Sequence, residues 1–306
     1  MSTAESQPIC RKAPATADPL ADLLAENASS DIYLPRTFLG AIYEHILGGL
    51  VDWSRGCTPV ILTITGPFGC GKSTMLSEAL RRLGVQRFRL PASAAESRWA
   101  GEPAQKLKDL YLQAAEQQAG EGRPAALVID DLDLGLGDFG ATGTTNAQHT
   151  LSALMERADT PEELEGRRVD RVAVVATAND VTKLYGALHR PGRMRVFRWD
   201  PRGEDLRHIG AHILRDLLPA SLVARIAAVR PSWTLAHYSQ LRSHLLRASL
   251  RRAGRGCSAA ELLAHLAGGG DVGLPRGRMT GETVREALDA VEAEDAAKID
   301  YTRTNG

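Results

Sequence analysis

Val60-Ile61-Leu62-Thr63-Ile64-Thr65 runs directly into Gly66-Pro67-Phe68-Gly69-Cys70-Gly71-Lys72-Ser73, and this stretch decides the fold. Its first six residues are apolar or β-branched, which predicts a buried strand. The next eight fit the pattern G-x-x-x-x-G-K-S, whose glycines let backbone N–H groups close around phosphate oxygens. A helix is expected from Ser73 to about Arg82, with the positive end of its dipole facing the same phosphates. A glycine-rich turn without a ligand is the alternative, but it leaves the Lys-Ser pair unexplained.

The phosphate-binding loop also indicates the chemistry of its ligand. Lys72 is expected to reach the β- and γ-phosphates of a nucleotide, and the hydroxyl of Ser73 to ligate Mg²⁺. ATP and Mg²⁺ are therefore the predicted cofactors. The residues predicted to bind the nucleotide are Gly66, Pro67, Phe68, Gly69, Cys70, Gly71, Lys72, Ser73 and Thr74.

Length, charge and cysteine content narrow the class of protein. The chain has 306 residues, of which 43% are hydrophobic, enough for two domains or for one core with an appendage. Its 37 basic and 37 acidic residues balance, which favours neither nucleic acid nor an anionic membrane as a partner. The four cysteines form no C-x-x-C pair, and no apolar run approaches the ~20 residues of a membrane span. With no signal-peptide pattern at the N-terminus, we expect a soluble cytoplasmic protein.

Strands and helices alternate through the first two-thirds of the chain. Four further short strands are expected, at residues 86–90, 126–129, 171–176 and 196–199. Apolar strands separated by helices predict a parallel sheet covered by helices on both faces. Past Pro201 the pattern predicts helices alone, so the predicted fold class is α/β, a P-loop parallel sheet between helices followed by a small α-helical lid domain. The expected parts are a mostly disordered N-terminal arm (1–30), in which residues 19–24 could form one helical turn, the α/β domain (31–200) and the lid (201–306).

Polar residues follow two of the predicted strands. Asp130 and Asp131 come directly after the third strand, where ligands of open parallel sheets bind. Asp130 is expected to hold Mg²⁺ and Asp131 to orient or deprotonate the attacking water. A helix N-cap or a surface turn is the alternative, which the phosphate-binding loop in the same sheet disfavours. Asn179 ends the next strand and could position water beside the γ-phosphate, although a turn asparagine explains it equally well.

Two arginines stand close together in Arg190-Pro191-Gly192-Arg193. Arginine is planar, permanently charged and multidentate, so such a pair suits the γ-phosphate of a nucleotide held by a neighbouring subunit. This interpretation implies a ring or a dimer. The alternative is a basic surface turn.

The order of these parts is that of AAA+ ATPases, and the chain resembles one branch of them, the green-type Rubisco activases. The resemblance runs from about Asp31 to Asp300. It rests on Gly66–Ser73, Ala100-Gly101-Glu102-Pro103-Ala104, Asp131-Leu132-Asp133, Asn146-Ala147-Gln148, Leu154-Met155, Asn179-Asp180, Leu184-Tyr185 and Gly192-Arg193-Met194. It implies an ATP-hydrolysing AAA+ remodelling chaperone that works as a homo-oligomeric, hexameric ring.

The resemblance also assigns roles to single residues. Arg190 and Arg193 match the family's two arginine fingers, and Arg242 matches the first sensor-2 arginine of the lid. His244 stands where the family carries a second arginine, a departure that would make closure of the lid on nucleotide weaker or sensitive to pH. Asp131 matches the family's catalytic acid, and Asp130 replaces its usual Asn.

Two loops match the family's pore loops, which contact the client protein. The first, Ser97–Gly101, contains Trp99-Ala100-Gly101, an aromatic–apolar–Gly pattern like the peptide-gripping loop of threading AAA+ machines, so we expect Trp99 to grip a client segment. The activase family has a polar residue at the Trp99 position. Packing of the indole on its own loop is the alternative. The second is Gly135–Thr145. The 30-residue arm is shorter than the family's Rubisco-engaging N-terminal domain, so the client is either Rubisco or a different protein complex.

Two rival functions come from other classes of protein. A nucleotide-switched scaffold would bind a partner with little hydrolysis. An ATP-dependent nucleic-acid machine of the clamp-loader or initiator type would carry a basic face, which the neutral charge balance disfavours. A P-loop small-molecule kinase would have no use for the paired arginines and the lid.

Overall fold

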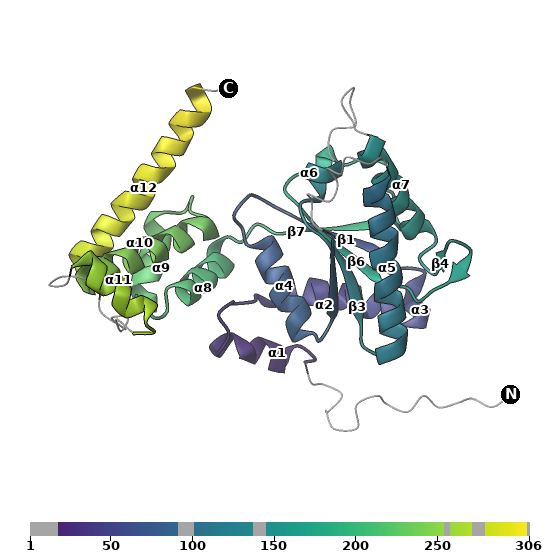
Figure 1. The fold of residues 1–306 in the computed structure, drawn as a ribbon, viewed down its shortest axis with the longest axis horizontal. Coiled ribbons are helices and arrows are strands. Elements are labelled where there is room, and N and C mark those ends of the chain that lie inside the picture. The colour runs from purple at the N-terminus through teal and green to yellow at the C-terminus, as the bar shows by residue number, and fades with distance from the viewer. Residues whose placement is uncertain (1–17, 91–100, 137–144, 254–257, 271–278, 305–306) are drawn as a thin grey trace.

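The computed structural model describes residues 18–90, 101–136, 145–253, 258–270 and 279–304 (Figure 1). Trp99 and most of both predicted pore loops lie outside the described residues, so the roles assigned to them stay predictions. Among the described helices, none has the length and apolar character needed to cross a bilayer.

Five parallel strands form the central sheet in the order β2–β3–β6–β1–β7. They are β1 (Ile61–Thr65), β2 (Gln86–Leu90), β3 (Ala125–Ile129), β6 (Ala173–Ala178) and β7 (Met194–Arg198). The phosphate-binding loop leaves the carboxyl end of β1, between β6 and β7. A separate antiparallel hairpin of β4 (Glu163–Leu164) and β5 (Arg167–Arg168) was not predicted.

Helices cover both faces of the sheet (Figure 1). One face packs against α2 (Arg36–Leu50) and α4 (Lys72–Arg82), and the other against α5 (Glu102–Glu121) and α7 (Thr145–Asp159). In β3, Val128 belongs to the first hydrophobic cluster and Leu127 to the second, because successive side chains of a strand point to opposite faces. This two-sided burial explains the continuous apolar runs, and the predicted α/β fold class is confirmed.

The C-terminal region is helical, as predicted. It consists of α8 (Gly203–Ile213), α9 (Ala220–Val229), α10 (Leu235–Ala253), α11 (Ala259–Ala267) and α12 (Gly281–Thr304). Side chains of α8 and α10, among them Ile209 and Leu241, share one hydrophobic cluster with the α2–α4 face of the sheet. Trp199, directly after β7, lies in this cluster and donates its indole N–H to the carbonyl of Cys70 at 2.9 Å. The helical region is thus packed against the part of the protein that carries the phosphate-binding loop.

The N-terminal segment corrects one prediction. Residues 18–30 are not a disordered arm: they form α1 (Ala21–Ala25) and a 3₁₀ turn (Glu26–Ala28), and Leu20 is buried. The segment is held by Arg82 at the end of α4, whose guanidinium donates to the carbonyls of Leu23 and Ile32 at 2.8 and 2.6 Å. The possible helical turn at residues 19–24 corresponds to α1, whereas the rest of residues 18–30 is folded and not disordered. The two short helices α3 (Asp52–Arg55) and α6 (Leu132–Leu136) and a 3₁₀ turn (Val181–Lys183) complete the described elements.

Candidate nucleotide site

The phosphate-binding loop requires glycine for steric reasons. A Cβ on Gly66 would lie 1.8 Å from the carbonyl oxygen of Trp199, so no other residue fits this approach. Gly71 has a φ of 82°, in the left-handed region that side chains disfavour, and α4 begins at the next residue. The first backbone N–H groups of α4 therefore face the loop, where an anion is stabilised by the helix dipole.

Lys72 and Asn179 meet at the centre of the site. The Lys72 ammonium donates to the carbonyls of Gly66 and Pro67 at 2.7 and 2.9 Å, and to Oδ1 of Asn179 at 2.9 Å. Because an ammonium has three donors, these contacts use all of them. A bound phosphate would have to replace at least one of these contacts. Because Asn179 is one of the three partners, its contact with Lys72 would be affected by phosphate binding.

The remaining loop residues differ in exposure. The side chain of Phe68 is 74% exposed, whereas Cys70 is buried with its Sγ 3.5 Å from the carbonyl oxygen of Trp199. Burial raises the pKa of the Cys70 thiol, which makes it a poor nucleophile. Thr74 lines both of the cavities described below, one on either side of the loop.

Asp130 lies beside Ser73 in a cavity of about 190 Å³. The carboxylate is nearly buried, and its Oδ2 accepts a hydrogen bond from Nε of Arg89 on β2 at 2.5 Å. Hydroxyl and carboxylate oxygens are the ligands that Mg²⁺ takes in proteins, so the two side chains fit the predicted metal ion. The ion pair with Arg89 was not predicted, because Arg89 has no sequence neighbour that marks it.

Asp131 has an unusual backbone conformation. Its φ is 49°, in the left-handed region, and its N–H donates to Oγ1 of Thr177 at 3.0 Å. Such a conformation costs a non-glycine residue on the order of 1 kcal/mol and persists where surrounding contacts impose it. Here the contact from β6 holds the residue that is expected to orient the attacking water.

Asp133 is a site residue that the sequence analysis did not assign. Its buried carboxylate accepts hydrogen bonds from the backbone N–H of Asn179 at 3.1 Å and of Asp180 at 3.0 Å. It thereby ties the end of β3 to the end of β6 and fixes the position of Asn179. The signals in the sequence were its place two residues after Asp131 and its presence in the Asp131-Leu132-Asp133 stretch that carries the family resemblance.

A second cavity, of about 370 Å³, adjoins the other side of the loop. Its walls come from residues 31–33, from the loop and α4, and from α8 and α10, and they are mostly apolar, with Ile32, Met75 and Ile213 among them. His212 also lines it, and burial lowers the pKa of this imidazole, as does the nearby Arg215 guanidinium. An apolar slot of this size beside a phosphate-binding loop suits a planar base.

The two predicted arginine fingers lie at the opposite edge of the sheet. The backbone carbonyl of Arg193 accepts from the N–H of Ile61, the first residue of β1, whereas the loop leaves the far end of that strand, about 13 Å away. Arg193 forms a two-pronged ion pair with Asp159 at 2.6 and 2.5 Å, and Arg190 is exposed. The structure therefore does not bring either arginine to the phosphate-binding loop of its own chain.

Arg242 and His244 contact other parts of the helical region. Arg242 forms an ion pair with Asp216 and donates to the carbonyl of Ile213 at 2.7 Å, so it does not line the cavity beside the loop. Nε2 of His244 lies 3.0 Å from a carboxylate oxygen of Glu294 on α12. The predicted sensor role of Arg242 would require its guanidinium to leave Asp216.

These features define a class of protein. A phosphate-binding loop follows the central strand of a parallel sheet, acids and an asparagine end the neighbouring strands, and a helical region closes over the loop. Residues 62–202 match the family described as the ATPase family associated with various cellular activities (AAA). This part of the chain is therefore similar to AAA ATPases.

Within that class the chain resembles Rubisco activase. It is 32% identical over 236 residues to the chloroplastic ribulose bisphosphate carboxylase/oxygenase activase of Spinacia oleracea, covering 74% of this chain and 50% of the relative. The activase of Anabaena sp. is 31% identical over 228 residues, 72% of this chain and 55% of the relative. The activase of Chlamydomonas reinhardtii is 34% identical over 187 residues, which cover 58% of this chain and 46% of the relative. The chain thus spans about half the length of the curated relatives it matches.

Proposed function

We propose that this chain is an ATP-driven remodelling chaperone that acts as a ring on a client protein complex, in the manner of an activase. The separation of the two arginines from their own phosphate-binding loop carries the proposal. Arg190 and Arg193 precede β7 at the amino edge of the sheet, and the loop lies at the carboxyl edge. In an assembly, they can serve the nucleotide of a neighbouring copy, which gives them the role of arginine fingers.

In this proposal ATP is bound by Gly66 to Thr74, with its base in the cavity of about 370 Å³. Lys72 exchanges its carbonyl contacts for phosphate oxygens. Ser73 and Asp130 hold Mg²⁺, which when bound neutralises charge on the phosphates. Asp131 and Asn179 orient the attacking water.

The helical region would transmit the nucleotide state. Because α8 and α10 line the cavity proposed for the base, a change in occupancy would alter their packing against the sheet. Arg242 would act as the sensor by exchanging Asp216 for the nucleotide. Motion of this region would drive the pore loops, with Trp99 gripping the client; a hexameric ring, a cytoplasmic location and Rubisco or another complex as client all belong to the proposal.

Subunit mixing tests the shared site. Lys72→Ala and Arg193→Ala are each expected to abolish ATP turnover, the first by removing a phosphate ligand and the second by removing a finger. A mixture of the two variants should regain part of the activity, because an intact loop in one subunit meets an intact Arg193 in its neighbour. Mixtures of Lys72→Ala with Lys72→Arg provide the control. If the first mixture stays as inactive as this control, the arginine does not act between subunits and the proposal fails.

A further inference from the structure

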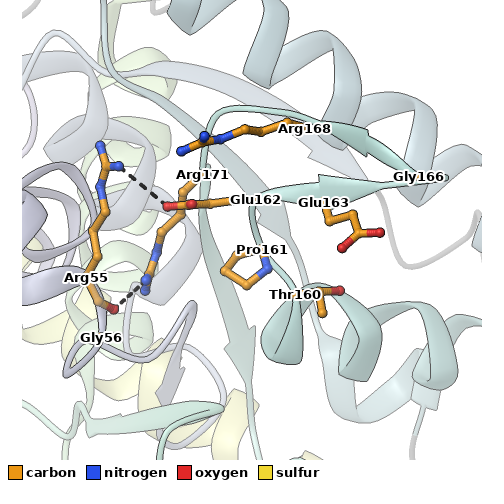
Figure 2. Close-up of a pocket in the computed structure, with 9 residues that line it drawn as sticks. All are labelled: Arg55, Gly56, Thr160, Pro161, Glu162, Glu163, Gly166, Arg168 and Arg171. Atoms are coloured by element: carbon orange, nitrogen blue, oxygen red, sulfur yellow. Dashed lines mark hydrogen bonds and ion pairs between the residues drawn. The ribbon is translucent and has the colours of Figure 1, made fainter.

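A separate cavity of about 630 Å³ lies near the amino edge of the sheet, and no residue of the phosphate-binding loop lines it. Figure 2 shows the residues that do. It is bounded by the end of α3, by the β4–β5 hairpin and by the residues just before β6. Three arginines line it: Arg55, Arg168 and Arg171. None of the functional-site residues predicted from the sequence lines it, and the proposed function does not use it.

The three guanidinium groups are held differently. Arg171 is buried, and one of its Nη atoms donates to the carbonyl of Arg55 at 2.5 Å, so this side chain is fixed in place. Arg55 pairs only loosely, with Nη1 3.2 Å from Asp52 and 3.5 Å from Glu162, and one N–H of its Nη2 donates to the carbonyl of Leu50 at 3.3 Å. Its Nε is buried and has no hydrogen-bond partner within the described part of the chain. Arg168 is exposed and forms no ion pair with any described residue.

One carboxylate points into this group. Glu162 extends toward Arg55, whereas Glu163 points away from the three arginines (Figure 2). The cavity therefore has more positive charge than its own walls neutralise, since the other acid near Arg55, Asp52, is 90% exposed to solvent. A buried donor without a partner, such as Nε of Arg55, is costly, whereas the exposed guanidinium of Arg168 is hydrated and can exchange water for an anion.

We propose that this cavity is an anion site that takes a small phosphate-bearing molecule. Guanidinium groups bind phosphate oxygens through paired, charge-assisted hydrogen bonds, and Arg55 and Arg168 have free donors for them. Arg171 supplies fixed positive charge at the wall. A volume of about 630 Å³ accommodates more than a bare phosphate and lies in the range of small-molecule sites. Glu162 competes with the ligand for Arg55.

Calorimetric titration with inorganic pyrophosphate tests the site. The titration uses the full chain carrying Lys72→Ala, so that the phosphate-binding loop does not contribute. Adding Arg168→Gln should weaken binding at least about tenfold, through loss of a charge-assisted contact. Arg167→Gln is the matched control, because Arg167 is an equally exposed arginine on the same hairpin that does not line the cavity. Thermal melting followed by circular dichroism checks that both variants stay folded.

A second variant is expected to strengthen pyrophosphate binding instead of weakening it. Glu162→Gln removes the competing carboxylate and should tighten pyrophosphate binding several-fold. Binding that is equally weakened by Arg167→Gln and Arg168→Gln would reduce the effect to general surface charge and overturn the proposal. An absence of saturable binding in the Lys72→Ala protein would overturn it as well, and would leave the proposed ATPase function unaffected.

Discussion

Replacement of Arg82 by alanine should be among the most destabilising single changes in this protein. The side chain is fully buried, and its guanidinium donates to Oε1 of Glu78 at 2.7 Å, to Oδ1 of Asn27 at 2.9 Å, and to the carbonyls of Leu23 and Ile32. These bonds join the end of α4 to the N-terminal segment. Glu78 is itself 7% exposed, and its arginine partners hold the pKa of its carboxyl at about 2.

The expected loss follows from what alanine leaves behind. Alanine takes away the donor of the carbonyls of Leu23 and Ile32 and of Oδ1 of Asn27, and it removes one of the two arginine partners of Glu78. Breaking a buried, hydrogen-bonded ion pair of this kind costs roughly 3–5 kcal/mol. Typical domains have only about 5–15 kcal/mol of stability, so this is a large share. Arg81→Ala is the matched control: Arg81 also pairs with Glu78, but its side chain is 58% exposed, and pairs of this kind contribute about 1 kcal/mol or less.

Urea unfolding followed by circular dichroism measures the two losses. Arg82→Lys, which keeps the charge but loses the planar fork, gives a milder variant in case the alanine protein does not fold. Because Ile32 lines the cavity proposed for the base, Arg82→Lys should also weaken the binding of a fluorescent ATP analogue, whereas Arg81→Ala should not. Equal destabilisation by Arg81→Ala and Arg82→Ala, within about 1 kcal/mol, would refute this account of how the segment is held.

Three further predictions concern the sheet and its carboxyl edge. Burial lowers the pKa of His45 to about 4, below its ordinary 6.5, so the unfolded state binds the proton more readily between these values. As the pH drops from 7 to 4, the free energy of unfolding of the unmodified protein should fall by about 3 kcal/mol more than that of the His45→Gln variant. Parallel plots of unfolding free energy against pH for the two proteins would contradict this. Arg89→Gln should free Asp130 and lower the Mg²⁺ concentration at which a fluorescent nucleotide binds half-maximally; an unchanged or higher midpoint would show that Arg89 does not compete with the ion. Asp133→Asn should cost about 1–3 kcal/mol of stability in urea and reduce ATP turnover, because the backbone N–H groups of Asn179 and its neighbour lose a charged acceptor; normal turnover would remove Asp133 from the site.

Several features of the site followed from local patterns. The strand, the glycine-rich loop and the start of α4 lie within fourteen consecutive residues, and each is indicated by its own residue types. The positions of Asp130 and Asn179 at the ends of neighbouring strands followed in turn, because parallel strands present their carboxyl ends at one edge. The distance of 2.9 Å between the Lys72 ammonium and the Asn179 side chain agrees with that expectation. The roles of Arg242, His244 and Trp99 stay predictions.

Other features could not be predicted because they join residues that are distant in the chain. The Ser30 hydroxyl donates to Oε1 of Glu78 at 2.8 Å across 48 positions, and Asp133 accepts from the backbone N–H of Asn179 across 46. Nothing in the sequence distinguishes Arg82 from an ordinary exposed arginine at the end of a helix. Only its burial in the folded protein shows that it holds residues 18–30 in place. The ion pair of Arg193 with Asp159 could not be predicted either, because the sequence motif contains the arginine but not its partner.

The sequence by itself therefore determined the α/β class, the phosphate-binding loop and the helical C-terminal region, since periodicity and glycine placement act over a few residues. Only the tertiary structure decided which side chains hold these parts in place, and where the arginines lie relative to the loop. The physical reason is that the strength of an ion pair or a hydrogen bond depends on burial and on partners, and both are set by packing between distant segments.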